Sequence, residues 1–79
     1  MDIVHKQLLK TLYELDLDNP RDFVNSEVLT GKLKVDDTEL RINSLYLREK
    51  GYIKCGKTTF DDFELKITQK GIELVKKMV

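Results

Sequence analysis

The sequence has few residues that could crosslink the chain or hold a metal ion. Its 79 residues include one cysteine and one histidine. A single cysteine excludes an internal disulfide, and one residue of each kind is too few for a structural zinc site. Tryptophan and alanine are absent, and the only proline is Pro20. We therefore expect a fold held by side-chain packing, without a metal or another cofactor.

Long apolar runs are also missing. The longest is the three-residue run Leu45–Leu47, whereas a membrane-spanning helix needs about 20 apolar residues and a signal-peptide core about 7–15. A cytoplasmic protein is therefore expected. Hydrophobic residues make up 41% of the chain, which is enough for one core, so residues 1–79 are predicted to form a single domain.

No motif in the chain indicates catalysis. The sequence contains neither a nucleophile motif nor a glycine-rich loop that would cradle a phosphate group. A domain of this length also has little room for a catalytic cleft. We expect that the protein is not an enzyme.

The net charge is zero, because 14 basic residues balance 14 acidic ones. This disfavours indiscriminate binding to nucleic acid, which needs a basic excess. The charge is unevenly distributed, however. Residues 1–31 carry three basic and six acidic side chains, and residues 32–79 carry eleven basic and eight acidic. A polyanion would therefore dock on the second part of the chain.

Apolar spacing predicts a first helix over Asp2–Leu15. Its core stripe has helical periodicity and consists of Val4, Leu8, Leu12 and Leu15. Leu9 and Tyr13 lie off this stripe. Asn19-Pro20 should form a turn, and Phe23-Val24 a very short strand.

Two further helices are predicted from their capping residues. Asn25 is placed to cap a short helix that Gly31 stops or loosens. Asp36 and Glu39 are spaced as a capping box, beginning a helix that continues to about Lys50. Gly51 then suits the left-handed residue that ends a helix.

After Gly51 the apolar period changes from 3.6 to 2. This predicts strands over Tyr52–Cys55 and Phe63–Ile67, joined by a polar loop over Gly56–Asp62. Thr68 is then expected to cap a last helix that ends at Met78.

Two segments carry a resemblance to a known family. Residues 33–53 (LKVDDTELRINSLYLREKGYI) and 65–78 (LKITQKGIELVKKM) resemble the winged helix-turn-helix superfamily, in particular small stand-alone proteins of bacteria, archaea and phages of the YjcQ-like kind. The resemblance implies an α+β fold with a three-helix core, a two-stranded β-hairpin wing and a C-terminal helix. Gly71 would let the last helix approach another backbone closely.

The same resemblance implies a sequence-specific, DNA-binding transcriptional regulator that contacts double-stranded DNA through the third helix and the wing. The candidate nucleic-acid-binding residues are Lys32 and Lys34 in the turn, Thr38, Arg41 and Arg48 on the third helix, and Lys57 and Thr58 in the wing. Arg41 could donate to a guanine edge. It could equally pair with Asp37 one turn earlier.

Acidic residues oppose this assignment. Asp36, Asp37 and Glu39 gather at the helix end that should approach phosphates, and the predicted wing loop has one lysine and two aspartates. Ile42 and Leu45 are apolar where polar residues would read bases. The alternative is therefore a winged helix that binds protein without DNA, or a homodimer, with Ile42 and Leu45 as the interaction candidates.

Three other groups of residues contain side chains that could carry chemistry. Asp16, Asp18, Asp22 and Glu27 have the spacing of a calcium loop, but arginine stands where that loop needs glycine, so an acidic solvated loop is expected. His5 is predicted to be a surface residue, and Cys55 a buried, inert thiol. The pair Asp61-Asp62 is expected in a flexible wing without a pocket.

Overall fold

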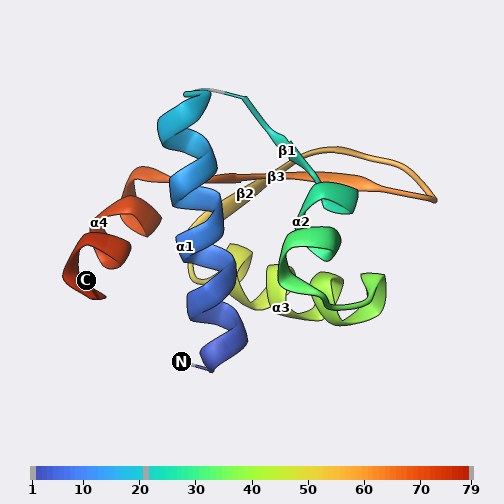
Figure 1. The fold of residues 1–79 in the computed structure, drawn as a ribbon, viewed down its shortest axis with the longest axis horizontal. Coiled ribbons are helices and arrows are strands. Elements are labelled where there is room, and N and C mark those ends of the chain that lie inside the picture. Colours follow the sequence, from blue (N-terminus) through green and yellow to red (C-terminus); the bar gives the residue numbers. More distant parts are fainter. Residues whose placement is uncertain (1, 21, 79) are drawn as a thin grey trace.

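The computed structural model describes residues 2–20 and 22–78 and shows an α+β fold with four helices and one antiparallel sheet (Figure 1). In chain order the elements are α1 (Ile3–Asp18), β1 (Val24–Asn25), α2 (Ser26–Leu33), α3 (Asp37–Glu49), β2 (Ile53–Thr58), β3 (Phe63–Ile67) and α4 (Gln69–Met78). None of the helices in these described ranges is both long and apolar enough to cross a membrane.

The sheet has the strand order β1-β3-β2, so β3 is central. Val24 is opposite Leu65 on one side, and Ile53 is opposite Ile67 on the other. The predicted alternation in β3 is confirmed, because Phe63, Leu65 and Ile67 are all buried. Figure 1 shows α1 crossing the sheet, with α2 and α4 to either side and α3 below.

Leucines from three helices complete the core. The fully buried ones are Leu8, Leu9, Leu12, Leu29, Leu40 and Leu47. The placement of Leu9 off the core stripe was wrong, because α1 is flanked by both α4 and the other helices and buries a wider face than one stripe. The helix also continues three residues past its predicted end, to Asp18. The first strand is Val24–Asn25, one residue later than predicted.

The second helix is short, as predicted, but Gly31 is not the residue that stops it. Helix α2 passes through Gly31 and ends at Leu33. The residue that leaves the helix is Lys34, in the left-handed conformation with φ 57°. Glycine lowers helix propensity by only about 1 kcal/mol, which the packing of buried Leu29 can offset. The prediction for the start of α2 is confirmed, since the Asn25 side chain accepts a hydrogen bond from the Glu27 N–H at 2.8 Å.

Both predicted ends of α3 are confirmed. The Asp36 carboxylate accepts a bond from the Glu39 N–H at 2.7 Å. At the other end Gly51 has φ 82°. Its N–H donates to the Arg48 carbonyl at 2.9 Å, and the Tyr52 N–H donates to the Leu47 carbonyl at 3.0 Å. This is the Schellman arrangement that glycine favours.

The second strand is longer, and the connection to the third strand shorter, than predicted. Strand β2 continues to Thr58, so only residues 59–62 connect it to β3, and the expected loop over Gly56–Asp62 was too long. The register is irregular between Cys55 and Thr58. This irregularity interrupts the alternation of inward and outward side chains, so a strict period of two does not predict the second half of the strand.

The last helix begins as predicted and lies very close to the sheet. The Thr68 hydroxyl accepts from the Gly71 N–H at 3.2 Å. A Cβ atom on Gly71 would lie 2.2 Å from the Tyr52 carbonyl oxygen. The prediction that Gly71 permits close backbone approach is therefore confirmed.

Candidate nucleic-acid interface

Helix α3 has one face in the core and one face in solvent. Leu40, Ser44 and Leu47 are buried. Ile42 is 65% exposed and Leu45 is 48% exposed, and Thr38, one turn before Ile42, is exposed as well. The helix therefore exposes two aliphatic side chains, Ile42 and Leu45, on its solvent face.

A shallow depression separates α3 from the hairpin. It is lined by Arg41, Ser44, Leu45, Arg48, Cys55, Thr58 and Phe63. Three of the candidate residues, Arg41, Arg48 and Thr58, thus lie around one feature although they come from two elements. Leucine, cysteine and phenylalanine make its surface predominantly apolar, with the guanidinium groups of the two arginines as its cationic groups.

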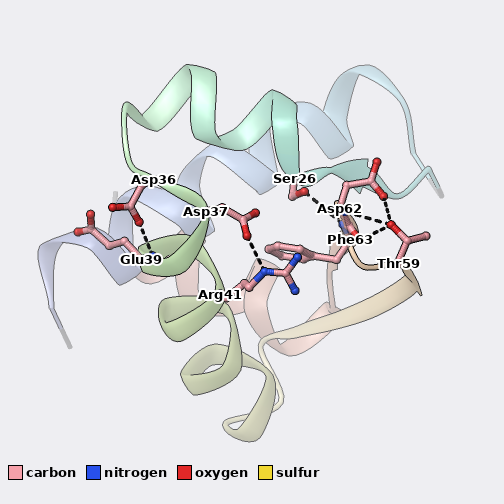
Figure 2. Close-up of polar contacts among 8 residues, drawn as sticks. All are labelled: Ser26, Asp36, Asp37, Glu39, Arg41, Thr59, Asp62 and Phe63. Atoms are coloured by element: carbon pink, nitrogen blue, oxygen red, sulfur yellow. Dashed lines mark hydrogen bonds and ion pairs between the residues drawn. The ribbon is translucent and has the colours of Figure 1, made fainter.

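The Arg41 side chain is held by two neighbours (Figure 2). Its Nε donates to the Asp37 carboxylate at 2.6 Å, and its guanidinium carbon lies 4.6 Å from the centroid of the Phe63 ring. Both side chains of the ion pair are partly exposed, so the pair itself stabilises the helix by only about 0.3–0.5 kcal/mol. The main effect of the pair is to orient the Arg41 side chain, so that its guanidinium points toward the hairpin.

The acidic residues at the start of α3 have structural roles. Asp36 caps the helix, as Figure 2 shows, and Asp37 pairs with Arg41. Carboxylates at a helix N-terminus are stabilised by the helix dipole. Their negative charge still faces solvent there, which makes this end of α3 less suited to phosphate contact than the end that carries Arg48.

The remaining candidates are more scattered. Lys32 belongs to the last turn of α2, not to the turn after it, and lies in a depression between α1 and α2. Lys34 ends α2. Lys57 is a strand residue, like Thr58, and not part of a loop. Its backbone N–H donates to the Glu64 carboxylate at 3.1 Å, so a negative charge lies beside it.

The turn of the hairpin is ordered by hydrogen bonds, in contrast to the flexible wing that the sequence suggested. The Thr59 hydroxyl bonds the Asp62 carboxylate at 2.8 Å, and the Asn25 side-chain amide donates to that carboxylate at 3.1 Å. Hydrogen bonds from Asn25 and Thr59 lower the pKa of Asp62 below its ordinary value of 3.8. Phe60, within this turn, is 99% exposed.

The Asp61-Asp62 pair borders a shallow, open depression in the surface, together with Asn25 and Lys57. This depression is open to solvent, and Asp62 is engaged in structural hydrogen bonds. The two aspartates therefore give no indication of a catalytic pair.

A buried serine that no sequence pattern indicated also holds the hairpin in place. The Ser26 hydroxyl, at the first position of α2, accepts from the Phe63 N–H at 3.2 Å (Figure 2). Ser26 is buried. This bond attaches β3 to α2 beside the Arg41–Phe63 contact, so it sets the distance between α3 and the hairpin.

The structure also places Cys55, His5 and Asp16, for which the sequence made predictions. Cys55 is half-buried and lines the depression, so the expectation of a buried thiol was wrong. His5 is partly exposed and stacks on Tyr46, with the ring centroids 4.2 Å apart. Asp16 pairs with Lys66 at 2.9 Å, and no group of three or more potential metal ligands occurs in residues 2–20 and 22–78.

Comparisons with known proteins support the fold. No protein-family model matches the chain, and no curated protein matches its sequence. Among solved structures, a protein from Ralstonia eutropha JMP134 that bears the name putative DNA-binding protein has a similar structure, with a TM-score of 0.87 and 17% sequence identity. The similarity covers 99% of this chain and 96% of the other. At this identity it shows a shared α+β fold.

Proposed function

We propose that this chain is a winged helix-turn-helix domain that binds double-stranded DNA sequence-specifically and regulates transcription. In this assignment α2 and α3 form the helix-turn-helix, and the β2–β3 hairpin is the wing. Helix α3 would enter the major groove, and the wing would contact the adjacent backbone or minor groove.

The arrangement around the depression is the observation that carries the proposal. It sets the outward face of α3 beside the hairpin, with Arg41 and Arg48 between them. A DNA strand that leaves the major groove would pass there, and guanidinium groups are well suited to its phosphates. The similar protein from Ralstonia eutropha JMP134 has a name that refers to DNA binding, which agrees with the proposal at a general level.

Charge favours a selective mode of binding. The chain has no net charge, so non-specific affinity, which depends mainly on phosphate neutralisation, should be weak. Affinity must then come from base contacts and shape. The proposal involves no catalysis and no cofactor.

The direct test is selection from a pool of random duplexes at two salt concentrations. A winged helix that reads DNA should enrich a defined sequence at low salt, and chemical-shift mapping with that duplex should identify α3 and the hairpin. The absence of any enriched sequence at low salt would contradict the proposal.

Two variants test the contacts to the DNA backbone. Arg41→Ala and Lys34→Ala should each weaken binding of the selected duplex and of unrelated duplexes alike, because each removes a cation placed for phosphates. Asp37→Ala serves as the positional control for Arg41, because it retains the guanidinium but removes the carboxylate that holds its Nε. It should leave the order of preference among duplexes unchanged.

The alternative function, a protein-interaction module or homodimer, is favoured by one observation. Ile42 and Leu45 are both exposed on α3, and a partner that buried them would gain about 25 cal/mol for each Å² of apolar surface. Under this alternative the double variant Ile42→Ser, Leu45→Ser would remain folded and lose a partner or its self-association. Light scattering of both proteins, together with affinity capture from the native host, decides it.

A further inference from the structure

The outward face of α3 has a chemical character that narrows the kind of DNA it can recognise. This inference rests on the proposed function. The centre of the face consists of Thr38, Ile42 and Leu45, at i, i+4 and i+7, and all three are exposed. Positions four and seven residues apart lie on one side of a helix. The side chains that would lie deepest in a major groove are therefore one hydroxyl and two aliphatic groups.

The cationic side chain nearest this row is turned toward one side of it. Arg41 is held by its Nε bond to Asp37 and by the Phe63 ring, and it lines the depression beside the hairpin. Arg48 lines the same depression. Both guanidinium groups are consequently better placed for the phosphates at the edge of the groove than for base edges at its centre.

The charges around the row fit DNA better than an apolar protein surface. Arg41 and Arg48 flank the row on α3 and line the depression, and Lys50 follows the helix. The opposing charges are the carboxylates at the start of α3, of which Asp37 pairs with Arg41, and Glu49 on the exposed face one turn after Leu45. A carboxylate in that place can accept from the amino group of cytosine. An apolar row with cations on its flank matches a groove with phosphates along its edge.

We propose that Ile42 and Leu45 contact the 5-methyl groups of thymines in the major groove, so that this chain selects duplexes with thymine at neighbouring positions. Thymine is the base that presents an apolar group in that groove. The two residues are separated by about 4.5 Å along the helix axis at 1.5 Å per residue. This is close to the 3.4 Å between successive bases of one strand, so the two contacts fall on adjacent or alternate base pairs.

The test replaces thymine with deoxyuridine throughout the selected site. Deoxyuridine pairs with adenine as thymine does and lacks only the methyl group. We expect the wild-type protein to bind the substituted duplex about three- to fivefold more weakly for each methyl group contacted. Because this comparison uses one unaltered protein, no effect of a substitution on folding can influence it.

Variants then assign the methyl contacts to residues. Ile42→Ala and Leu45→Ala should each bind the thymine duplex more weakly and lose most of their sensitivity to deoxyuridine. Leu17→Ala is the matched control, since Leu17 is 62% exposed and belongs to the last turn of α1. Figure 1 shows that this end of α1 lies away from α3. It should keep the wild-type ratio of affinities for the two duplexes.

Each other outcome has a distinct meaning. Equal wild-type affinity for both duplexes, or a selected site without thymine, would overturn the methyl contacts and leave DNA binding intact. Unchanged deoxyuridine sensitivity in both alanine variants would overturn the assignment to these residues. A change of oligomeric state in the variants, with DNA affinity preserved, would assign the row to a protein contact. If selection yields no duplex, the proposed function fails, and this inference fails with it.

Discussion

Gly71 shows how one residue can control the joining of two elements. Its Cα is so near the sheet that a Cβ would lie 2.2 Å from the Tyr52 carbonyl oxygen and 2.7 Å from Cγ1 of Ile67. Real atoms do not approach so closely, and the first obstacle is backbone, which cannot rotate away as a side chain can. Only glycine therefore allows α4 to pack at this distance.

We predict that Gly71→Ala lowers the free energy of unfolding by about 1–3 kcal/mol, because the helix must move off the sheet. Gly31→Ala is the control. It lies inside α2, where nothing stands within 4 Å of a new Cβ, so the substitution should stabilise by about 0.4–1 kcal/mol. Urea denaturation of the three proteins measures both effects. A Gly71→Ala protein as stable as the wild type would show that α4 is not constrained by this contact.

At the scale of elements, the hairpin depends on its turn. The Asp62 carboxylate, in the turn, accepts a hydrogen bond from the side chain of Asn25, just before α2. Ser26, the next residue after Asn25, accepts one from the N–H of Phe63, the first residue of β3. These contacts link residues 37 apart in sequence. They fix the hairpin relative to α2, and through the packing of α2 on α3 they fix it relative to the outward face of α3.

The Asp62 bonds predict a dependence of stability on pH. Because Asn25 and Thr59 lower the pKa of Asp62 in the folded protein, the ionised carboxylate stabilises the fold at neutral pH. This contribution is present above the ordinary pKa of 3.8 and is lost as the pH falls below it, through the folded value. Unfolding by urea between pH 6 and pH 2 should therefore show a smaller acid-dependent loss in Asp62→Ala than in the wild type.

Asp61→Ala is the comparison for that measurement. Asp61 is exposed and makes none of these hydrogen bonds within the part of the chain that the structure describes. Its acid dependence should follow that of the wild type. An Asp62→Ala protein whose acid dependence equals that of the wild type would show that the turn bonds contribute nothing to the pH response.

At the scale of the whole molecule, a net charge of zero conceals an uneven distribution. Residues 32–79 have eleven basic and eight acidic side chains, and they supply α3, the hairpin and α4. The cations near the proposed interface are few, chiefly Arg41, Arg48 and Lys57. Binding to DNA should consequently be less sensitive to salt than that of a strongly basic protein.

We predict a slope of about −3 when the logarithm of the association constant for the selected duplex is plotted against that of salt concentration, at about −0.9 for each phosphate neutralised. Arg48→Ala should reduce the magnitude of the slope by about 1. Lys76→Ala, in the last turn of α4, should leave it unchanged. A slope that Arg48→Ala does not alter would place the phosphate contacts elsewhere.

Much of the fold follows from local sequence. The caps at Asn25 and Asp36, the left-handed glycine after α3 and the alternation in β3 each depend on a few consecutive residues, so they could be predicted. The errors at Gly31 and Leu9 have a common cause, because packing against other elements outweighed a weak local preference. The error in β2 has another cause, since a register irregularity between Cys55 and Thr58 interrupts the period of two.

Part of the candidate interface also follows from local sequence, and the rest depends on tertiary packing. The sequence by itself determined that α3 has a core face and an outward face, because helical periodicity separates Leu40 and Leu47 from Ile42 and Leu45. Only the tertiary structure decided what stands beside the outward face. The contact of Arg41 with Phe63 and the bond from Phe63 to Ser26 bring together residues that are 22 and 37 positions apart, and the half-buried Cys55 lines the same depression as Arg41 and Phe63. No periodicity encodes such distances, since they are set by how the helices and the sheet pack around one core.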